Sequence, residues 1–158
     1  MKKNVIFSGV IGAVLLFGAV VCQAEKWDKN NFEDAKVASG YYNADSIKVK
    51  GKVVSWTEKY ILTKVGVADV NTELSRHQKC KLNIEKMGEA TQYQLDCQIK
   101  KGKFRGVAKR YYTKKNELIC TTKDMGKEFV TNWSEILRGS PMQQAQYDLV
   151  TKYKVKFE

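Results

Sequence analysis

The sequence predicts an α+β fold in which antiparallel strands precede a C-terminal helix that packs on the sheet. Short runs with alternating or β-branched residues recur between residues 46 and 122, and turn residues separate them, as in half-buried strands. A helix-start motif at Ser140 is followed by apolar residues at helical spacing. With 158 residues, 43% of them hydrophobic, the chain can bury one core, which excludes a multi-domain enzyme and a disordered polyelectrolyte.

The first 24 residues have the pattern of a secretory signal peptide. Lys2 and Lys3 precede an uncharged apolar run over residues 5–21, and Cys22-Gln23-Ala24 places small residues three and one before a cleavage point. Two alternatives stay open: an uncleaved membrane anchor, which needs about 20 apolar residues, and lipidation of the cysteine, which is preceded by valine rather than a small residue. Cleavage after Ala24 would leave residues 25–158 as one exported domain without a transmembrane span.

Cleavage also changes the charge and the cysteine count. The formal charge falls from +11 to +9, because Lys2 and Lys3 leave and no acidic residue does. Cys80, Cys97 and Cys120 remain, and an oxidising compartment favours a disulfide between two of them. Because three is an odd number, one thiol stays outside that bond.

Residues 46–62 predict a hairpin, because β-branched and aromatic residues flank a break at Gly51. Alternation also predicts two strands within residues 78–99, joined by the loop MGEA. In one antiparallel register Cys80 lies opposite Cys97 and every apolar side chain shares a face. Cys80–Cys97 is therefore the favoured disulfide, worth roughly 3 kcal/mol in the chain-entropy account, and Cys97–Cys120 is its rival.

The remaining elements follow in order. Lys101-Gly102 predicts a turn into a strand over residues 104–112, and residues 117–122 predict another strand. Ser140 is expected to cap the last helix, with proline at its first position and a glutamine completing a capping box. Its apolar residues at helical spacing, expected to dock the helix on the sheet, are Met142, Ala145, Leu149 and Tyr153, with Val150 beside them.

Motifs of catalysis are absent from the sequence. It lacks a nucleophile elbow, a zinc-protease helix, a Cys-x-x-Cys pair and a phosphate loop. The single histidine, His77, has no metal-ligand pattern around it and is expected to be an exposed strand-edge residue. We therefore expect no enzyme, cofactor or metal. The alternative is an unrecognised hydrolase, which a cleft with a carboxylate pair would reveal.

The strongest local feature is a basic run with interleaved aromatic residues over 100–115. Strict alternation places Arg105, Lys109 and Tyr111 on one face of its strand. Such a surface attracts acidic polymers or anionic lipid heads. The alternative is a solvated, lysine-rich face that protects a sheet edge, since lysines are spread widely over the chain. The candidate ligand-binding residues are Lys101, Lys103, Arg105, Lys109, Arg110 and Tyr111.

Several short motifs occur in the order found in the surface-adhesin protein E family of Gram-negative bacteria, which the chain resembles over most of residues 27–150. Asn43-Ala44 stands where the family has Asp-Pro, Arg138 replaces a proline, and the family's cysteine near the end of the last helix is absent, which again favours Cys80 as the partner of Cys97. The motifs are Trp27, Tyr41 to Ile47, Gly51 with Val53 to Trp56, Asp96-Cys97, Tyr111-Tyr112, and Trp133, Ile136, Gly139 and Ser140.

This resemblance implies a single antiparallel sheet of about six strands with a C-terminal helix on one face. It implies a non-enzymatic protein of the periplasm or outer-membrane surface that binds host matrix or plasma proteins, and a homodimer. With the basic run, the expected partners are a protein or an acidic polymer or lipid surface, and no specific nucleic acid. The alternative function is a periplasmic structural or inhibitor-like module that binds another envelope component.

Overall fold

The computed structural model describes residues 25–30, 36–126 and 132–157, and within these ranges the chain forms seven strands and three helices. The predicted signal peptide lies outside the described residues, so its cleavage stays a prediction. No helix in the described ranges is both long and apolar enough to cross a membrane. The elements are β1 (Trp27–Lys29), β2 (Ala38–Lys50), β3 (Val53–Leu62), α1 (Lys64–Leu74), α2 (Gln78–Met87), β4 (Gln92–Lys100), β5 (Lys103–Tyr112), β6 (Leu118–Thr121), β7 (Ser134–Glu135) and α3 (Pro141–Thr151).

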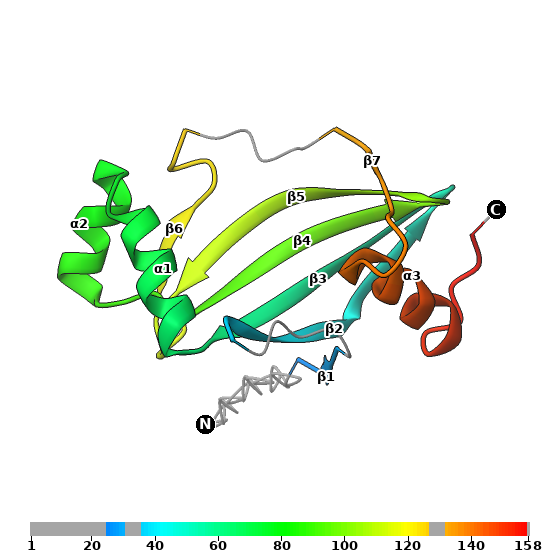
Figure 1. Cartoon of the computed structure of the whole chain (residues 1–158), viewed down its shortest axis with the longest axis horizontal. Helices are drawn as coiled ribbons and strands as arrows, with labels where there is room; N and C mark the ends of the chain where they lie inside the picture. The colour runs from blue at the N-terminus through cyan, green and yellow to red at the C-terminus, as the bar shows by residue number, and fades with distance from the viewer. Residues whose placement is uncertain (1–24, 31–35, 127–131, 158) are drawn as a thin grey trace, which may run out of the picture.

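The described strands form one antiparallel sheet in the order β1-β2-β3-β4-β5-β6, with β7 paired to the start of β5. Gly51 and Gly102 make the tight turns of the β2–β3 and β4–β5 hairpins, each with a positive φ that favours glycine. Figure 1 shows α1 and α2 at one end of the long strands and α3 towards the other. The predicted α+β class, with one antiparallel sheet and a C-terminal helix, is confirmed.

Two apolar clusters lie on the same face of the sheet, because the side chains of β4 that enter them, Tyr93, Cys97 and Ile99, are spaced by even numbers of residues. We call this side the covered face and the opposite side the open face. Beneath α3 the cluster contains Tyr42, Val54, Trp56, Cys97, Ile99, Ala145, Leu149 and Val155. Beneath α1 and α2 it contains Leu74, Cys80, Ala90, Tyr111, Ile119, Cys120 and Met125.

The strand expected over the first part of residues 78–99 is wrong, because Gln78–Met87 is the helix α2. Cys80 and Ile84 are four residues apart and both enter the cluster beneath the helices, whereas Leu82 between them is exposed. A short run of alternating residues fits a helix stripe as well as a strand, and lysine, glutamine and methionine favour the helix. Gly88, with a positive φ, ends it.

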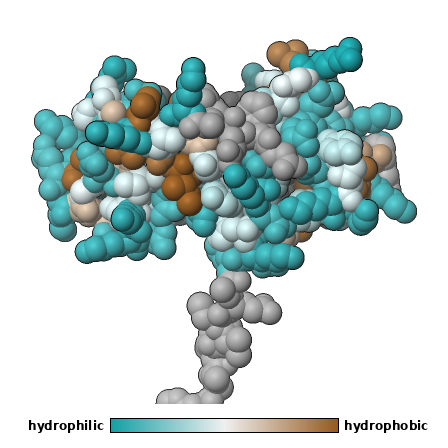
Figure 2. All heavy atoms as spheres, turned by 60° about the horizontal axis from the view of Figure 1, so that its bottom comes forward, coloured by the Kyte–Doolittle hydropathy of each residue, from teal (hydrophilic) through white to brown (hydrophobic). Residues whose placement is uncertain are grey.

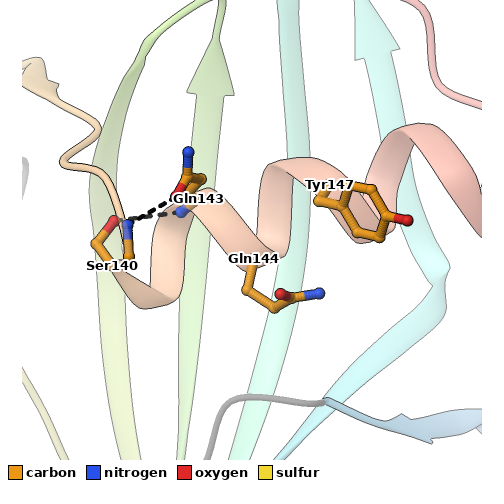
Figure 3. A pocket seen from close by; sticks show the side chains of 5 residues that line it. Ser140, Gln143, Gln144 and Tyr147 are labelled. Carbon is orange, nitrogen blue, oxygen red and sulfur yellow. Dashed lines mark hydrogen bonds between the residues drawn. The ribbon is translucent and has the colours of Figure 1, made fainter.

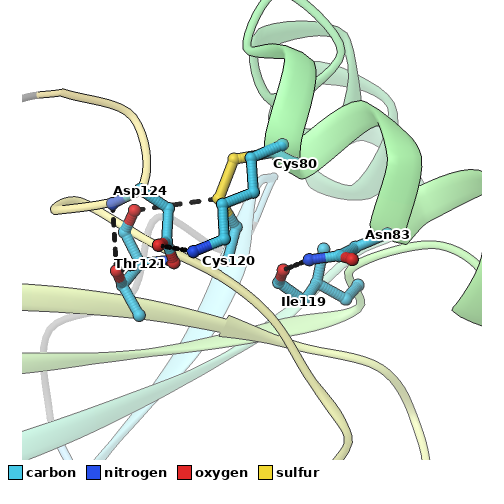
Figure 4. Close-up of a disulfide and its surroundings, with 7 residues drawn as sticks. Cys80, Asn83, Ile119, Cys120, Thr121 and Asp124 are labelled. Carbon is cyan, nitrogen blue, oxygen red and sulfur yellow. Dashed lines mark hydrogen bonds and ion pairs between the residues drawn. A yellow bond between two sulfur atoms is a disulfide. The ribbon is translucent and has the colours of Figure 1, made fainter.

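The expected disulfide Cys80–Cys97 is also wrong, since Cys80 is bonded to Cys120. With Cys80 on a helix rather than on a strand beside Cys97, its side chain reaches β6, as Figure 4 shows. Asn83 on the same helix donates to the Ile119 carbonyl at 2.6 Å, and Lys79 forms an ion pair with Asp124. Cys97 is a buried free thiol in the cluster beneath α3, and burial raises its pKa.

The C-terminal helix begins as predicted. Ser140 caps it by accepting from the Gln143 amide at 3.2 Å, and the Gln143 side chain accepts from the Gly139 amide rather than from Ser140. Met142, Ala145, Leu149 and Tyr153 contribute to the cluster on the sheet, whereas Val150 is exposed. In the view of Figure 2, apolar atoms form limited patches among hydrophilic side chains.

Substituting Ser140 with alanine removes the side-chain acceptor at the start of α3 and should lower the free energy of unfolding by about 1 kcal/mol. Chemical denaturation measures this loss. Ser140→Gly is the matched control, expected to cost only a few tenths of a kcal/mol, because glycine tolerates the capping position. Equal losses in the two variants would contradict a capping role.

Peptide mapping of the non-reduced protein should recover Cys80 joined to Cys120, with Cys97 alkylated only after unfolding. Reduction should destabilise the fold by about 4 kcal/mol, since the bond closes a sequence separation of 40 residues. Cys97→Ala should keep the same cross-link. A cross-linked peptide that contains Cys97, or its alkylation in the native protein, would contradict this pairing.

Candidate binding face

The open face is lined by polar, basic and aromatic side chains. It lies opposite both apolar clusters, and α1, α2 and α3 do not contribute to it. Because strands alternate, the register of the paired strands assigns its residues. They include Trp27, Tyr41, Lys48, Ser55, Thr57, Lys59, Ile61, Gln92, Gln94, Asp96, Gln98, Lys100, Lys103, Arg105, Arg110 and Tyr112.

A β-bulge in β5 determines which basic residues reach this face. Gly106 pairs with Cys97 and Ala108 pairs with Asp96, so Val107 is an extra residue. An extra residue reverses the alternation. Before Val107 the odd-numbered side chains of β5 point to the open face, and after it the even-numbered ones do. Arg105 points to the open face, but Lys109 lies over the rings of Tyr93 and Tyr111 on the covered face, with its Nζ 3.9 Å and 5.0 Å from their centres. The prediction that Arg105, Lys109 and Tyr111 share one face is wrong.

The structure therefore divides the six candidate ligand-binding residues. Lys103, Arg105 and Arg110 share the open face, and the amino group of Lys103 lies 3.0 Å from the Glu135 carboxylate. Lys101 is exposed in the β4–β5 turn. Tyr111 is buried in the cluster beneath α1 and α2, with Lys109 against it.

Two cation–aromatic groups border the open face, and the sequence-based prediction missed both. The amino group of Lys59 lies 4.2 Å from the ring centre of Trp27 and 5.9 Å from that of Tyr41. Partial burial lowers the pKa of Lys59. Lys100 and Arg105 lie 4.3 Å and 4.6 Å from the ring centre of Trp133.

The acidic side chain at the middle of the open face is already neutralised. Arg110 donates to both oxygens of Asp96, at 2.7 Å and 2.6 Å, and Thr57 donates to one of them at 2.9 Å. The hydrogen bonds to Asp96 raise the pKa of Arg110. Asp96 therefore does not offset the charge of Lys48, Lys59 and Arg105.

A shallow hollow of about 290 Å³ lies where the bulge of β5 faces a second irregularity in β2. Ser46 bridges the β2 irregularity, because its hydroxyl accepts from the Thr57 amide at 2.8 Å and donates to the Asn43 carbonyl at 2.7 Å. The hollow is lined mainly by residues with hydroxyl, amide or charged groups, together with Trp56, Cys97 and Val107. Its lining includes Ser46, Lys48, Ser55, Thr57, Asp96, Gln98 and Val107.

A second hollow, of about 350 Å³, lies beside the start of α3 and is drawn in Figure 3. Ser140 and Gln143 line it, but their side chains already make the capping hydrogen bonds. Gln144 donates to Asp148 at 2.8 Å, and Tyr147 is exposed. This hollow is formed by the first turns of α3, and its lining residues include no pair of groups suited to catalysis.

Glu58 is buried on the covered face, between the two apolar clusters. It accepts hydrogen bonds from the Trp56 indole at 2.9 Å and the Tyr60 hydroxyl at 2.5 Å. Burial raises its pKa, while these two hydrogen bonds act in the opposite direction. Tyr60 in turn stacks on Tyr93, with ring centres 4.8 Å apart. Glu58 therefore holds the Trp56 indole and the Tyr60 hydroxyl in one buried hydrogen-bonded group between the two clusters.

His77 directly precedes α2 and is half-buried, so its expected place on a strand edge is wrong. It makes no side-chain capping hydrogen bond. Within the described ranges, His, Cys, Asp and Glu side chains form no group of three or more that could hold a metal ion.

No family model matches the chain, and no match was found among curated proteins or solved structures.

The contribution of Glu58 to the unfolding free energy should fall as the pH rises above about 4.5, the ordinary pKa of a glutamate. Glu58 then keeps its proton in the folded state after the unfolded chain has released it, and the decrease ends at the raised native pKa. Glu58→Gln should lose this component, as denaturation from acidic to neutral pH would measure. The exposed control Glu89→Gln should retain it, and a stability difference between wild type and Glu58→Gln that does not decrease with pH would contradict the assignment.

Proposed function

We propose that this chain is an exported, non-enzymatic binding protein of the bacterial envelope or surface, and that its open face contacts acidic partners. One observation carries the proposal. The open face holds Lys48, Lys59 and Arg105, while its central carboxylate, Asp96, is occupied by Arg110 and Thr57. The excess positive charge attracts anionic surfaces over distances of about 10 Å at moderate salt.

The sequence supports the location and the class. The pattern of residues 1–24 favours export, and the oxidised Cys80–Cys120 pair suits an oxidising compartment. The resemblance to surface-adhesin protein E supports a binding role at the envelope. We infer no catalytic step, because Asp96, the open-face carboxylate that the Thr57 hydroxyl contacts, is held by Arg110 on both oxygens and is therefore a poor general base.

Retention on a sulfonated resin tests the binding role. The protein should bind at low salt and elute as salt rises, because screening weakens exposed charge pairs. The double variant Lys59→Glu/Arg105→Glu should elute earlier than the control Lys64→Glu/Lys86→Glu, which carries the same charge change on α1 and α2. Equal elution of the two variants would contradict a specific role of the open face.

Cell fractionation tests the location. The protein should be found with the periplasm or outer membrane, and its mature N-terminus should be Glu25. Accumulation in the cytoplasm with an intact Met1 would contradict export. Protease treatment of intact cells then separates a surface position, where the protein is cleaved, from a periplasmic one, where it is protected.

A further inference from the structure

We propose that the ligand of the open face is an acidic polysaccharide, a linear sugar chain with carboxylate or sulfate groups, that lies across the hollow between Lys48 and Arg105. This inference rests on the proposed function and adds the chemical class of the partner. It follows from how the strand register spaces the charged, hydroxyl and amide groups.

Four side chains form a row across the strands. The register pairs Lys48 with Ser55, Ser55 with Gln98, and Gln98 with Arg105. Neighbouring strands lie about 4.8 Å apart, so the two cations are attached to backbone positions roughly 14 Å apart. A hydroxyl and an amide lie between them. The row thus offers cations at its ends and neutral hydrogen-bonding groups in its middle.

Lys59 provides a third cation on the same face, farther along β3 from this row. It lies four residues after Ser55 on β3, or roughly 13 Å along the strand at about 3.3 Å per residue. Thr57, between them, lines the same hollow. Anionic groups repeated along a polymer, with hydroxyls between them, match this alternation of cations and neutral polar groups.

The same face is poorly suited to single-stranded nucleic acid. Bases bind by stacking on aromatic rings at the centre of a sheet. Here the central strands present Ser55, Thr57 and Lys59 from β3, and glutamines and Asp96 from β4. The aromatic rings of the open face lie outside these two strands: Trp27 on β1, Tyr41 on β2, Tyr112 on β5 and Trp133 beside the start of β5.

A bilayer or a protein partner is also less well matched. Both need apolar side chains, which insert among lipid chains or fill the centre of an interface. Six of the nine residues that line the hollow are polar or charged. Trp56 and Cys97 belong to the cluster beneath α3, which leaves Val107 as the aliphatic side chain at the bulge. Hydrogen-bonding groups between cations instead suit hydroxylated sugars.

The test is titration of the purified protein with heparin, polygalacturonate, a mixed-sequence single-stranded DNA and phosphatidylglycerol vesicles at two salt concentrations. Both polysaccharides should bind more tightly per anionic group than DNA or vesicles. Lys48→Gln/Arg105→Gln should weaken polysaccharide binding about tenfold and reduce the slope of log affinity against log salt by roughly one per cation removed. The control Lys64→Gln/Lys86→Gln should bind within about twofold of wild type, since it leaves the open face unchanged.

Thermal unfolding verifies that each variant is folded, and Ser55→Asp provides a second probe, because a carboxylate in the middle of the row should repel the polysaccharide. Tighter binding of DNA or vesicles would overturn the polysaccharide assignment and leave the proposed function standing. Equal losses in both double variants would remove the role of the open face and overturn both proposals. Absence of binding to all four probes would overturn the proposed function as well.

Discussion

The sheet must supply side chains to two separate apolar clusters on one face, and β5 meets this constraint only through an irregularity. In β3 every contribution to the covered face is spaced by an even number, from Val54 through Trp56 and Tyr60 to Leu62. In β5, however, Phe104 packs beneath α3 and Tyr111 packs beneath α1 and α2, seven residues apart. Strict alternation would place these two rings on opposite faces. The extra residue Val107 lets both enter the covered face.

The same irregularity shapes the open face. Because Val107 reverses the alternation, Arg105 and Arg110 both project outward although they are five residues apart. Arg110 holds Asp96, whereas Arg105 contacts Gln98 and the Trp133 ring. The extra residue Val107 therefore has two effects: it lets β5 fill both clusters, and it determines which charged side chains of β5 reach the open face.

Elements with strong local signals could be predicted from the sequence. The hairpin at Gly51 and the start of α3 at Ser140 depend on neighbouring residues and are confirmed. The sequence predicts a strand where Gln78–Met87 is a helix, because ten residues of mixed polarity fit both the two-residue period of a strand and the 3.6-residue period of a helix. The same error led to the wrong disulfide partner for Cys80.

The binding face shows where sequence reasoning stops. The basic run indicates Arg105 and Arg110, but the contact of Trp133 with Arg105 depends on the folded chain. The bulge at Val107 cannot be predicted from the pattern of alternating residues, so the face of each later residue in β5 cannot be predicted either.

The buried thiol of Cys97 has a consequence for how the protein keeps its cross-link. Three cysteines within residues 25–158 can form three different pairs, yet only Cys80–Cys120 forms. Closure of the α3 cluster over Cys97 removes that thiol from exchange, because buried thiols in apolar surroundings are inert. The docking of the last helix therefore protects the Cys80–Cys120 bond from exchange with Cys97, although that helix contributes no atom to the bond.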